Sequence, residues 1–273
     1  MSRHGNSGYI GKDKRTAKAG VYGLKKHYLE RLGGNFLLKA PSSSFDNKWS
    51  LLFDGADDYL EVASSADLNS AGDITISAWI KPDSSSTNFK FIWTKVDSGE
   101  SAGNRQYSLY IRNGAYPCNL SVYGGGIQLN SVGTVEADVW SHVAVTIESG
   151  ATNGVKLYIN GSAETLGTMT VSSHDSTFFI GRREDSNYEF AGNIDEVGVW
   201  RSVLSASDVG EIYNSGTPTD LAPYSPLYWW RMGDTQSPTV DTSTPTSVNN
   251  NGSVSGATAA LNNGPLYKED VPS

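Results

Sequence analysis

Three carboxylates lie close together in the segment Asp54-Gly55-Ala56-Asp57-Asp58. Hard oxygen ligands of this kind suit a calcium ion, so the segment is a candidate metal-binding loop. The same residue types also build tight turns, because Asp side chains accept backbone hydrogen bonds and Gly adopts positive φ angles. The sequence leaves both interpretations open, a calcium-binding loop and a structural turn.

The elements that would position this loop are short β-strands, Ser50–Phe53 before it and Tyr59–Val62 after it. Further strands are expected at Ile74–Ile80, Phe91–Val96, Tyr107–Arg112, Leu120–Tyr123, Val139–Glu148 and Val155–Ile159. Asn160-Gly161 follows the last of these and favours a type I′ hairpin turn. Evenly spaced strands with little helix between them predict a two-sheet sandwich rather than βαβ units.

The composition agrees with a turn-rich β protein. Of 273 residues, 38% are hydrophobic, 18% are charged and 29 are Gly. The single cysteine, Cys118, excludes an internal disulfide and is interpreted as a small buried side chain. No run of 18 apolar residues exists, so a membrane-spanning helix is not expected.

Charge is distributed unevenly along the chain. The net charge is −8, but residues 1–40 hold nine basic and two acidic side chains, which leaves 12 basic and 27 acidic residues elsewhere. We therefore predict that residues 1–45 form an extended basic arm. It would contain one short helix around residues 24–32, which would end at Gly33-Gly34. The basic residues assigned to this anchoring arm are Arg3, Lys12, Lys14, Arg15, Lys18, Lys25, Lys26 and Arg31.

The C-terminal part changes character again. Residues 217–273 form a Pro/Ser/Thr/Asn-rich extension with too few apolar residues for a separate core. Within it, residues 227–234 contain Trp229, Trp230 and Met232, which are too apolar to lie in water. We expect this segment to complete the sandwich that it follows, either in the same chain or in a neighbouring one. The resulting domain boundaries are 1–45, 46–216 and 217–273.

Four blocks in order resemble the laminin G-like, concanavalin A-type jelly-roll family. They begin at Ser50-Leu51-Leu52-Phe53-Asp54-Gly55, at Asp73-Ile74-Thr75-Ile76-Ser77-Ala78-Trp79 and at Trp140-Ser141-His142-Val143, and the last runs from Phe178 to Trp200. The resemblance covers roughly residues 48–216. It implies an all-β, two-sheet antiparallel jelly-roll sandwich, and it says more about fold than about function.

The resemblance also implies sites. Many members bind calcium through an Asp of the closing strand and groups of the opening block, which here are Asp195 with Asp54, Asp57 or Asp58. Sugar binding is the usual role of the fold, and exposed aromatic rings would stack on pyranose rings. The candidate ligand-binding residues are Tyr188, Tyr123, Trp93 and Tyr116.

Catalysis has little support. Retaining glycosidases of this fold carry nucleophile and acid on a Glu-x-Asp-x-(x)-Glu strand, with the two groups roughly 5 Å apart. Glu136-Ala137-Asp138-Val139-Trp140 begins like that strand but lacks the second Glu. His142 has no partner that the sequence identifies and is interpreted as a packed strand residue. We therefore expect that the protein is not an enzyme.

The leader resembles those of jelly-roll proteins from marine bacteriophages, and no secretory signal precedes it. We expect a virion structural protein made in the host cytoplasm, either a capsid decoration or a tail or fibre component. Other virion proteins would bind the arm, the sandwich would bind glycans such as cell-surface polysaccharide or another protein, and a homo-oligomer or multi-copy assembly is expected. We expect neither a membrane nor a nucleic acid as a partner. The alternative is a bacterial carbohydrate-active enzyme or its accessory module.

Overall fold

The computed structural model describes residues 31–32, 35–36, 45–85, 87–96, 105–183, 188–234, 247–249, 251, 259–262 and 265–273. The chain divides into two compact units, residues 1–44 and 45–273. In the first unit, β1 (Arg31–Leu32) pairs antiparallel with β2 (Asn35–Phe36). The helix expected around residues 24–32 is therefore wrong at its C-terminal end. Gly33-Gly34 separates two strands, and a Gly-Gly pair is a two-residue hairpin signal.

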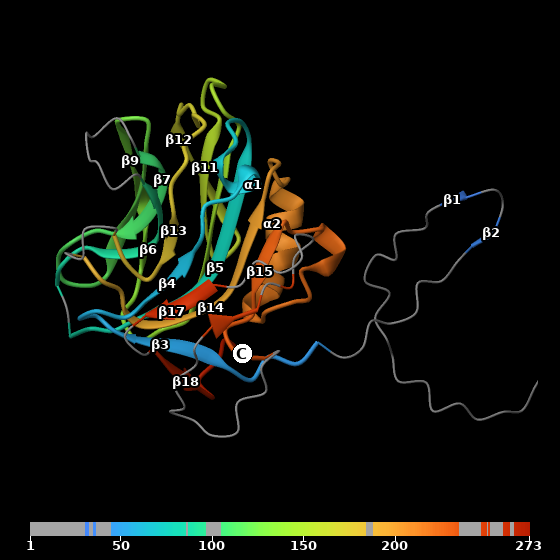
Figure 1. Ribbon diagram of the computed structural model, residues 1–273. Coiled ribbons are helices and arrows are strands. Elements are labelled where there is room, and N and C mark those ends of the chain that lie inside the picture. The colour runs from blue at the N-terminus through green and yellow to red at the C-terminus, as the bar shows by residue number, and fades with distance from the viewer. Residues whose placement is uncertain are drawn as a thin grey trace, which may run out of the picture. The chain divides into compact units, whose positions relative to one another are not determined.

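The second unit is an antiparallel sandwich of two sheets that lie face to face (Figure 1). The first sheet contains, in spatial order, β12 (Ser162–Gly167), β11 (Val155–Ile159), β10 (Ser141–Ile147), β5 (Ile74–Pro82), β14 (Ala191–Trp200), β3 (Ser50–Asp54) and β18 (Leu266–Lys268), and β15 (Tyr228–Trp230) also pairs with β14. The second contains β16 (Ser247–Val248), β17 (Ala259–Asn262), β4 (Tyr59–Val62), β13 (Phe178–Ile180), β6 (Lys90–Val96), β7 (Arg105–Ile111), β8 (Cys118–Gly124) and β9 (Ile127–Val135). The predicted all-β, two-sheet jelly roll is confirmed.

Alternating side chains of β10 show how the sandwich is built. Val143, Val145 and Ile147 point into the core between the sheets. The intervening side chains are buried as well, because α2 (Ala206–Tyr213) covers the outer side of this sheet, where Val209 contacts Ala144. Figure 1 shows α2 beside β14 and β15 on that side. Both faces of the first sheet are therefore occupied by protein.

Local capping explains where α2 begins. Ser205 accepts a hydrogen bond from the Asp208 backbone N–H, and the Asp208 carboxylate accepts one from the Ser205 backbone, which is a capping box. The remaining helical pieces are single turns: α1 (Ala66–Asn69), η1 (Asn214–Gly216) and η2 (Ala222–Tyr224). The Asn160-Gly161 turn has φ angles of 49° and 78°, so the predicted type I′ geometry is confirmed.

Strand β14 lies in the middle of the first sheet, and one of its edges pairs with two different strands. β3 pairs with Ala191–Ile194, and β15 pairs with Val197–Val199. On its other edge, the register against β5 shifts between Asp195 and Gly198, which is a β-bulge. Tyr228, Trp230 and Met232 enter the core from β15 and the residues after it, within the same chain.

The C-terminal extension also reaches both sheets. β17 pairs with β4 in the second sheet, and β18 pairs with β3 in the first. The Asp270 side chain accepts hydrogen bonds from Lys81 Nζ at 2.6 Å and Trp140 Nε1 at 2.9 Å. The described parts of the extension are thus added to the edges of the sandwich and do not form a core of their own.

Candidate functional site

The acidic segment between β3 and β4 forms a compact loop. Asp54 Oδ1 accepts hydrogen bonds from the backbone N–H groups of Ala56 (2.8 Å) and Asp57 (3.3 Å), and Asp58 Oδ2 accepts one from Asp54 N (2.9 Å). One carboxylate oxygen from each of the three Asp residues lies within 4.8 Å of the others. Burial raises the pKa of Asp58 to about 6, and the neighbouring carboxylates add to the shift. Three converging hard oxygens fit the donor chemistry of calcium.

Asp195, the fourth metal candidate, lies elsewhere. The strand register places Ala191 opposite Asp54, whereas Asp195 lies opposite Trp79. Asp195 is fully buried and accepts hydrogen bonds from Asn47 Nδ2 and from the Glu196 backbone, at 2.9 and 2.8 Å. The structure therefore brings together Asp54, Asp57 and Asp58 and does not bring Asp195 to them.

Glu196 occupies the bulge of β14 with a positive φ of 48°. Its Oε2 accepts a hydrogen bond from Trp229 Nε1 at 2.5 Å, and its Oε1 accepts one from Arg231 Nε at 3.1 Å. Arg231 also bonds Asp234 Oδ2 at 2.9 Å. Burial raises the pKa of Glu196 to about 7 and that of Asp195 well above its usual range, while Arg231 opposes the shift at Glu196. These contacts join β14 to β15, so we interpret the carboxyl pair as structural.

Tyr188 belongs to an aromatic stack on the outer face of the second sheet. Phe91 stacks on Tyr110 with 4.6 Å between the ring centroids and 18° between the planes, and on Tyr188 with 6.2 Å and 28°. The Arg183 guanidinium lies 4.4 Å from the Tyr188 ring centroid. Phe91 and Tyr110 are buried, yet neither belongs to the core cluster between the sheets. They therefore lie on the outer face.

A second aromatic group lies on the same face. Phe179 is flanked in β13 by two core residues and so points outward, where its ring meets Tyr59 edge-on at 5.9 Å. The Arg182 guanidinium lies 3.3 Å from the Tyr59 centroid and 4.9 Å from that of Phe179. We call the combined surface the aromatic shelf, and it comprises Tyr59, Phe89, Phe91, Tyr110, Phe179, Tyr188, Arg182 and Arg183.

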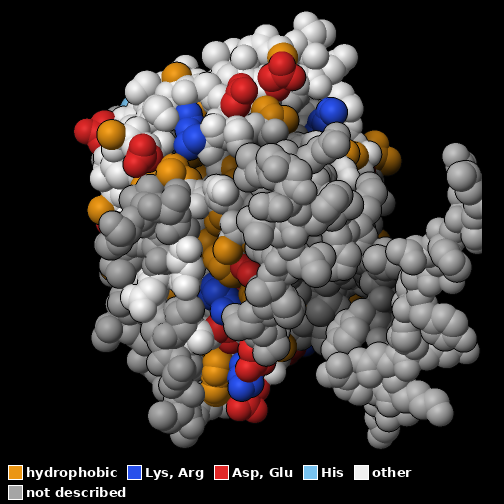
Figure 2. Space-filling model, turned by 90° about the vertical axis from the view of Figure 1, so that its right-hand side faces the viewer, with side chains coloured by type: hydrophobic (Ala, Val, Ile, Leu, Met, Phe, Trp, Pro, Cys, Tyr) orange, Lys and Arg blue, Asp and Glu red, His pale blue; other side chains and the backbone are white. Residues whose placement is uncertain are grey.

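The shelf and the acidic loop are neighbours. Tyr59 follows Asp58 directly in the chain. Burial raises the pKa of Glu189, Arg182 lowers it, and the charges of Asp57 and Asp54 raise it, so all four groups interact electrostatically. Figure 2 shows a different side of the molecule, the right-hand side of Figure 1, where acidic and basic side chains of the described residues are also interspersed.

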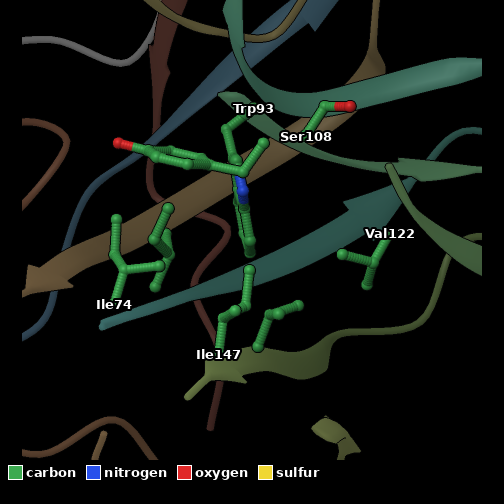
Figure 3. A pocket seen from close by; sticks show the side chains of 8 residues that line it. Ile74, Trp93, Ser108, Val122 and Ile147 are labelled. Atoms are coloured by element: carbon green, nitrogen blue, oxygen red, sulfur yellow. The ribbon is translucent and has the colours of Figure 1, made fainter. Parts of the chain in front are cut away.

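The other aromatic candidates differ in position. Trp93 is only 1% exposed and lines a core cavity with Ile74, Val122 and Ile147 (Figure 3). The cavity volume is about 10 Å³, which is at the lower limit for one water molecule and excludes a sugar. Tyr116 is half-buried against the core, with Lys90 Nζ 5.0 Å from its ring centroid. Tyr123 is half-buried on β8 opposite Ser108, on the same outer face as the shelf.

The described residues provide no catalytic pair at His142. Its ring packs against Trp79 and Tyr213 at centroid distances of 5.3 and 6.1 Å, and neither ring nitrogen has a hydrogen-bond partner in the described structure. Burial lowers its pKa to about 3, so the imidazole is neutral. Glu136 and Asp138 are exposed after the end of β9.

One segment of the sequence has the spacing of a catalytic serine motif. Gly99-Glu100-Ser101-Ala102-Gly103 matches the Gly-x-Ser-x-Gly pattern of hydrolase nucleophile elbows, and it lies outside the described residues. That motif requires a turn from a strand into a helix. Here it connects β6 to β7, which pair with each other as antiparallel strands. The described residues on either side of the pattern are therefore both strands.

The arm residues are almost entirely outside the described structure. Of the candidates, only Arg31 lies within it, as a backbone position of β1. Arg3, Lys12, Lys14, Arg15, Lys18, Lys25 and Lys26 lie outside the described residues. Among the described helices, none is long and apolar enough to cross a membrane.

Solved structures of other proteins have a similar fold. A solved structure of a putative carbohydrate binding protein from Bacteroides ovatus is 19% identical, with a TM-score of 0.58 over 84% of this chain and 62% of that one. A heptameric SAP-like pentraxin from Limulus polyphemus is 19% identical, with a TM-score of 0.50 over 62% of this chain and 84% of that one. At this identity both show the fold alone.

The chain is also similar in sequence to known proteins. The chain is 25% identical over 170 residues to the adhesion G-protein coupled receptor V1 of Danio rerio. This covers 58% of the chain but 3% of the receptor. A family model described as the Concanavalin A-like lectin/glucanases superfamily matches residues 54–210, which is more than half of the chain. The chain therefore belongs to the Concanavalin A-like lectin/glucanases superfamily, in its laminin G-like branch.

Proposed function

We propose that this protein is a non-catalytic structural protein of a bacteriophage virion whose sandwich binds glycans. The observation that carries the glycan proposal is the aromatic shelf. On the outer face of one sheet, the partly exposed rings of Tyr59, Phe89 and Tyr188 and two arginines lie around three buried rings, whereas α2 and residues around Leu221 pack on the corresponding side of the other sheet. Flat rings beside charged donors are the usual components of a sugar-binding surface.

Two names among the comparisons support the same proposal. The chain belongs to a superfamily described as lectins and glucanases, and the similar Bacteroides ovatus structure is described as a putative carbohydrate binding protein. The described residues supply no carboxylate pair or activated nucleophile at His142. Binding without turnover is therefore the simplest use of the shelf.

A calcium ion would bind beside the aromatic shelf. Asp54, Asp57 and Asp58 would hold the ion, since their carboxylates converge in the loop that leads to Tyr59. When bound, the ion would supply fixed positive charge and hold the loop in one conformation. The chain's own residues, Tyr59 and Arg182, would then be presented from a more rigid edge of the shelf.

The virion role concerns the N-terminal arm. Its nine basic residues precede an acidic body, which suits an arm that docks on an acidic surface of other virion proteins. Attachment through the arm would leave the sandwich facing outward on the capsid or the tail, in many copies. Deletion of residues 1–45 should then abolish incorporation into particles, and normal incorporation of the deletion would contradict this part of the proposal.

The glycan proposal is tested with a glycan array and a hydrolysis assay on the full chain. Wild-type protein should bind at least one glycan, and Tyr188→Ala should weaken that binding about tenfold, as for loss of one well-packed aromatic contact. Tyr188→Phe should retain most of it, and Tyr224→Ala, in η2 beside the first sheet, should retain all of it. Hydrolysis of a bound glycan would favour the alternative, a carbohydrate-active enzyme.

A further inference from the structure

Strand β6 places a lysine on the core side of the second sheet. Lys95 pairs with Tyr107 of β7 and with Phe178 of β13. Directly paired residues of neighbouring strands point to the same side of a sheet, and both rings belong to the core cluster between the sheets. Lys95 is 0% exposed. Its amine therefore lies inside the sandwich, where an ammonium charge is costly.

The amine of Lys95 is held by three oxygen atoms. Nζ donates hydrogen bonds to Asn69 Oδ1 at 2.8 Å, to the carbonyl oxygen of Ser176 at 2.5 Å and to Ser176 Oγ at 3.1 Å. These three acceptors are uncharged, and burial lowers the pKa of Lys95 to about 8. A buried amine of this kind is more nucleophilic at neutral pH than an exposed one, because more of it is uncharged.

The side-chain amide of Asn69 is also held at its nitrogen. Nδ2 donates hydrogen bonds to Ser64 Oγ at 2.8 Å and to Asp175 Oδ1 at 3.0 Å, and the Ser64 hydroxyl donates one to the same oxygen of Asp175. The hydrogen bonds from Ser64 and Asn69 lower the pKa of Asp175, so its carboxylate is ionised at neutral pH. One amide group thus has an amine at its oxygen and a carboxylate at its nitrogen.

The distances suit a reaction between the amine and the amide. A C=O bond is about 1.23 Å long, so the carbonyl carbon Cγ of Asn69 lies at most about 4.0 Å from Lys95 Nζ. A nucleophile reacts readily from about 3–3.5 Å, and a small rotation of the Asn69 amide would bring Cγ into that range. The contacts at Ser176 hold the amine in place during this movement.

The reaction would exchange one amide for another. The uncharged amine of Lys95 attacks Asn69 Cγ, so a bond forms between Nζ and Cγ. The bond between Cγ and Nδ2 then breaks, and Nδ2 leaves as ammonia. The Asp175 carboxylate, which interacts electrostatically with Lys95, takes up the proton that Nζ loses and delivers a proton to Nδ2. No oxidant, cofactor or water is consumed.

We propose that Lys95 and Asn69 form an intramolecular isopeptide bond, with Asp175 as the residue that transfers the proton. The bond joins β6 of the second sheet to α1, which leads into β5 of the first sheet. Such a cross-link stabilises the sandwich by restricting the unfolded chain, in the way that a disulfide does. This inference does not depend on the proposed glycan or virion function.

The test is the intact mass of the full chain, measured by mass spectrometry after unfolding. Wild-type protein should be lighter than the mass calculated from its sequence by one molecule of ammonia. Proteolysis should release a branched peptide in which Lys95 is joined to Asn69, and trypsin should not cleave after Lys95. The full calculated mass in wild-type protein that has been folded and purified would overturn the inference.

Variants locate the three groups. Asn69 is partly exposed and Asp175 is exposed, so Asn69→Ala and Asp175→Ala should fold, and both should have the full mass calculated from their own sequences. Lys95→Met should also have its full mass. Lys156→Met, which replaces an exposed lysine of β11, is the matched control and should still lack one ammonia.

The variants also exclude another source of ammonia loss. An asparagine side chain can lose ammonia by cyclising onto the following backbone nitrogen, and such a loss needs no lysine. A mass deficit that persists in Lys95→Met or in Asn69→Ala would therefore overturn the proposed bond. A deficit that persists only in Asp175→Ala would show that the bond forms and that the assignment of Asp175 is wrong.

Discussion

Arg231 Nε donates a hydrogen bond to Glu196 Oε1 at 3.1 Å, and the two side chains are only 14% and 2% exposed. The pair connects the bulge of β14 with the end of β15, two segments that are 35 residues apart in the chain. Arg231 also bonds Asp234 and the backbone carbonyl of Asp46, which brings the first residues of the sandwich to the same point. One guanidinium therefore holds three segments together.

The first prediction follows from removing that guanidinium. Arg231→Met should lower the free energy of unfolding by about 3–5 kcal/mol, because it leaves the buried carboxyl groups without their counter-charge. The measurement is chemical denaturation at pH 7. Lys48→Met, which breaks the exposed pair with Asp46, should change stability by less than about 1 kcal/mol. A loss below about 1 kcal/mol in Arg231→Met would contradict the structural role of the pair.

The second prediction concerns pH. Burial raises the pKa of Glu196 to about 7 from its ordinary 4.5, so the folded state holds a proton that the unfolded chain releases. The stability from this group is full below about pH 4.5 and is lost as the pH rises through 7. Between pH 5 and 8, wild type should lose about 1–3 kcal/mol relative to Glu196→Gln.

Comparing wild type with Glu196→Gln separates the effect of Glu196 on stability from that of His142, which changes stability with pH in the opposite direction. Burial lowers the pKa of His142 to about 3, so His142 costs stability as the pH falls below its ordinary 6.5. That cost is the same in wild type and Glu196→Gln and cancels in their difference. Parallel pH profiles for the two proteins would show that Glu196 does not titrate in this range.

The third prediction concerns the C-terminal extension. Tyr228 and Trp230 are fully buried, so deletion of residues 224–273 should lower the melting temperature markedly or prevent folding. Trp230→Ala should be milder and cost about 3–5 kcal/mol. Val132→Ala, at a position that is 89% exposed, should change stability by less than about 0.5 kcal/mol. An unchanged melting temperature after deletion would mean that the extension is not part of the sandwich.

The fourth prediction concerns calcium. If Asp54, Asp57 and Asp58 bind the ion, calcium at 100 times its dissociation constant should stabilise the fold by about 2.7 kcal/mol. Thermal unfolding with calcium, magnesium or chelator measures this. Asp57→Asn should remove most of the effect, whereas Glu148→Gln, an exposed carboxylate before a different turn, should not. Equal stabilisation of both variants would place the ion elsewhere.

The strands with strong local signals could be predicted from sequence. Alternation over Val143, Val145 and Ile147 located β10, and the Asn160-Gly161 turn located the hairpin that follows β11. Strand β9 was missed because it lies at the edge of its sheet and most of its side chains are exposed, so it has no apolar period. The short strands β16 to β18 were missed because they depend on pairing with one another and with β3 and β4, which are far away in sequence.

The site was only partly predictable for a similar reason. Asp54, Asp57 and Asp58 are close in sequence, so their convergence could be expected, but the register of β14 that separates Asp195 from them is a tertiary property. A bulge in β6 places both Ile92 and Trp93 in the core, which alternation does not foresee. Tyr188 was identified because it lies in a polar loop, whereas its stacking partners come from β6 and β7.

Hydrogen–deuterium exchange of the full chain, with and without the best glycan from the array, tests most directly whether the aromatic shelf is the recognition surface. The account predicts slower exchange of amides around Phe89–Phe91, Phe179–Arg183 and Tyr188, with no change in β10 and β11 of the opposite sheet. Slower exchange in β10 and β11 with an unchanged shelf, or no glycan-dependent change anywhere, would contradict it.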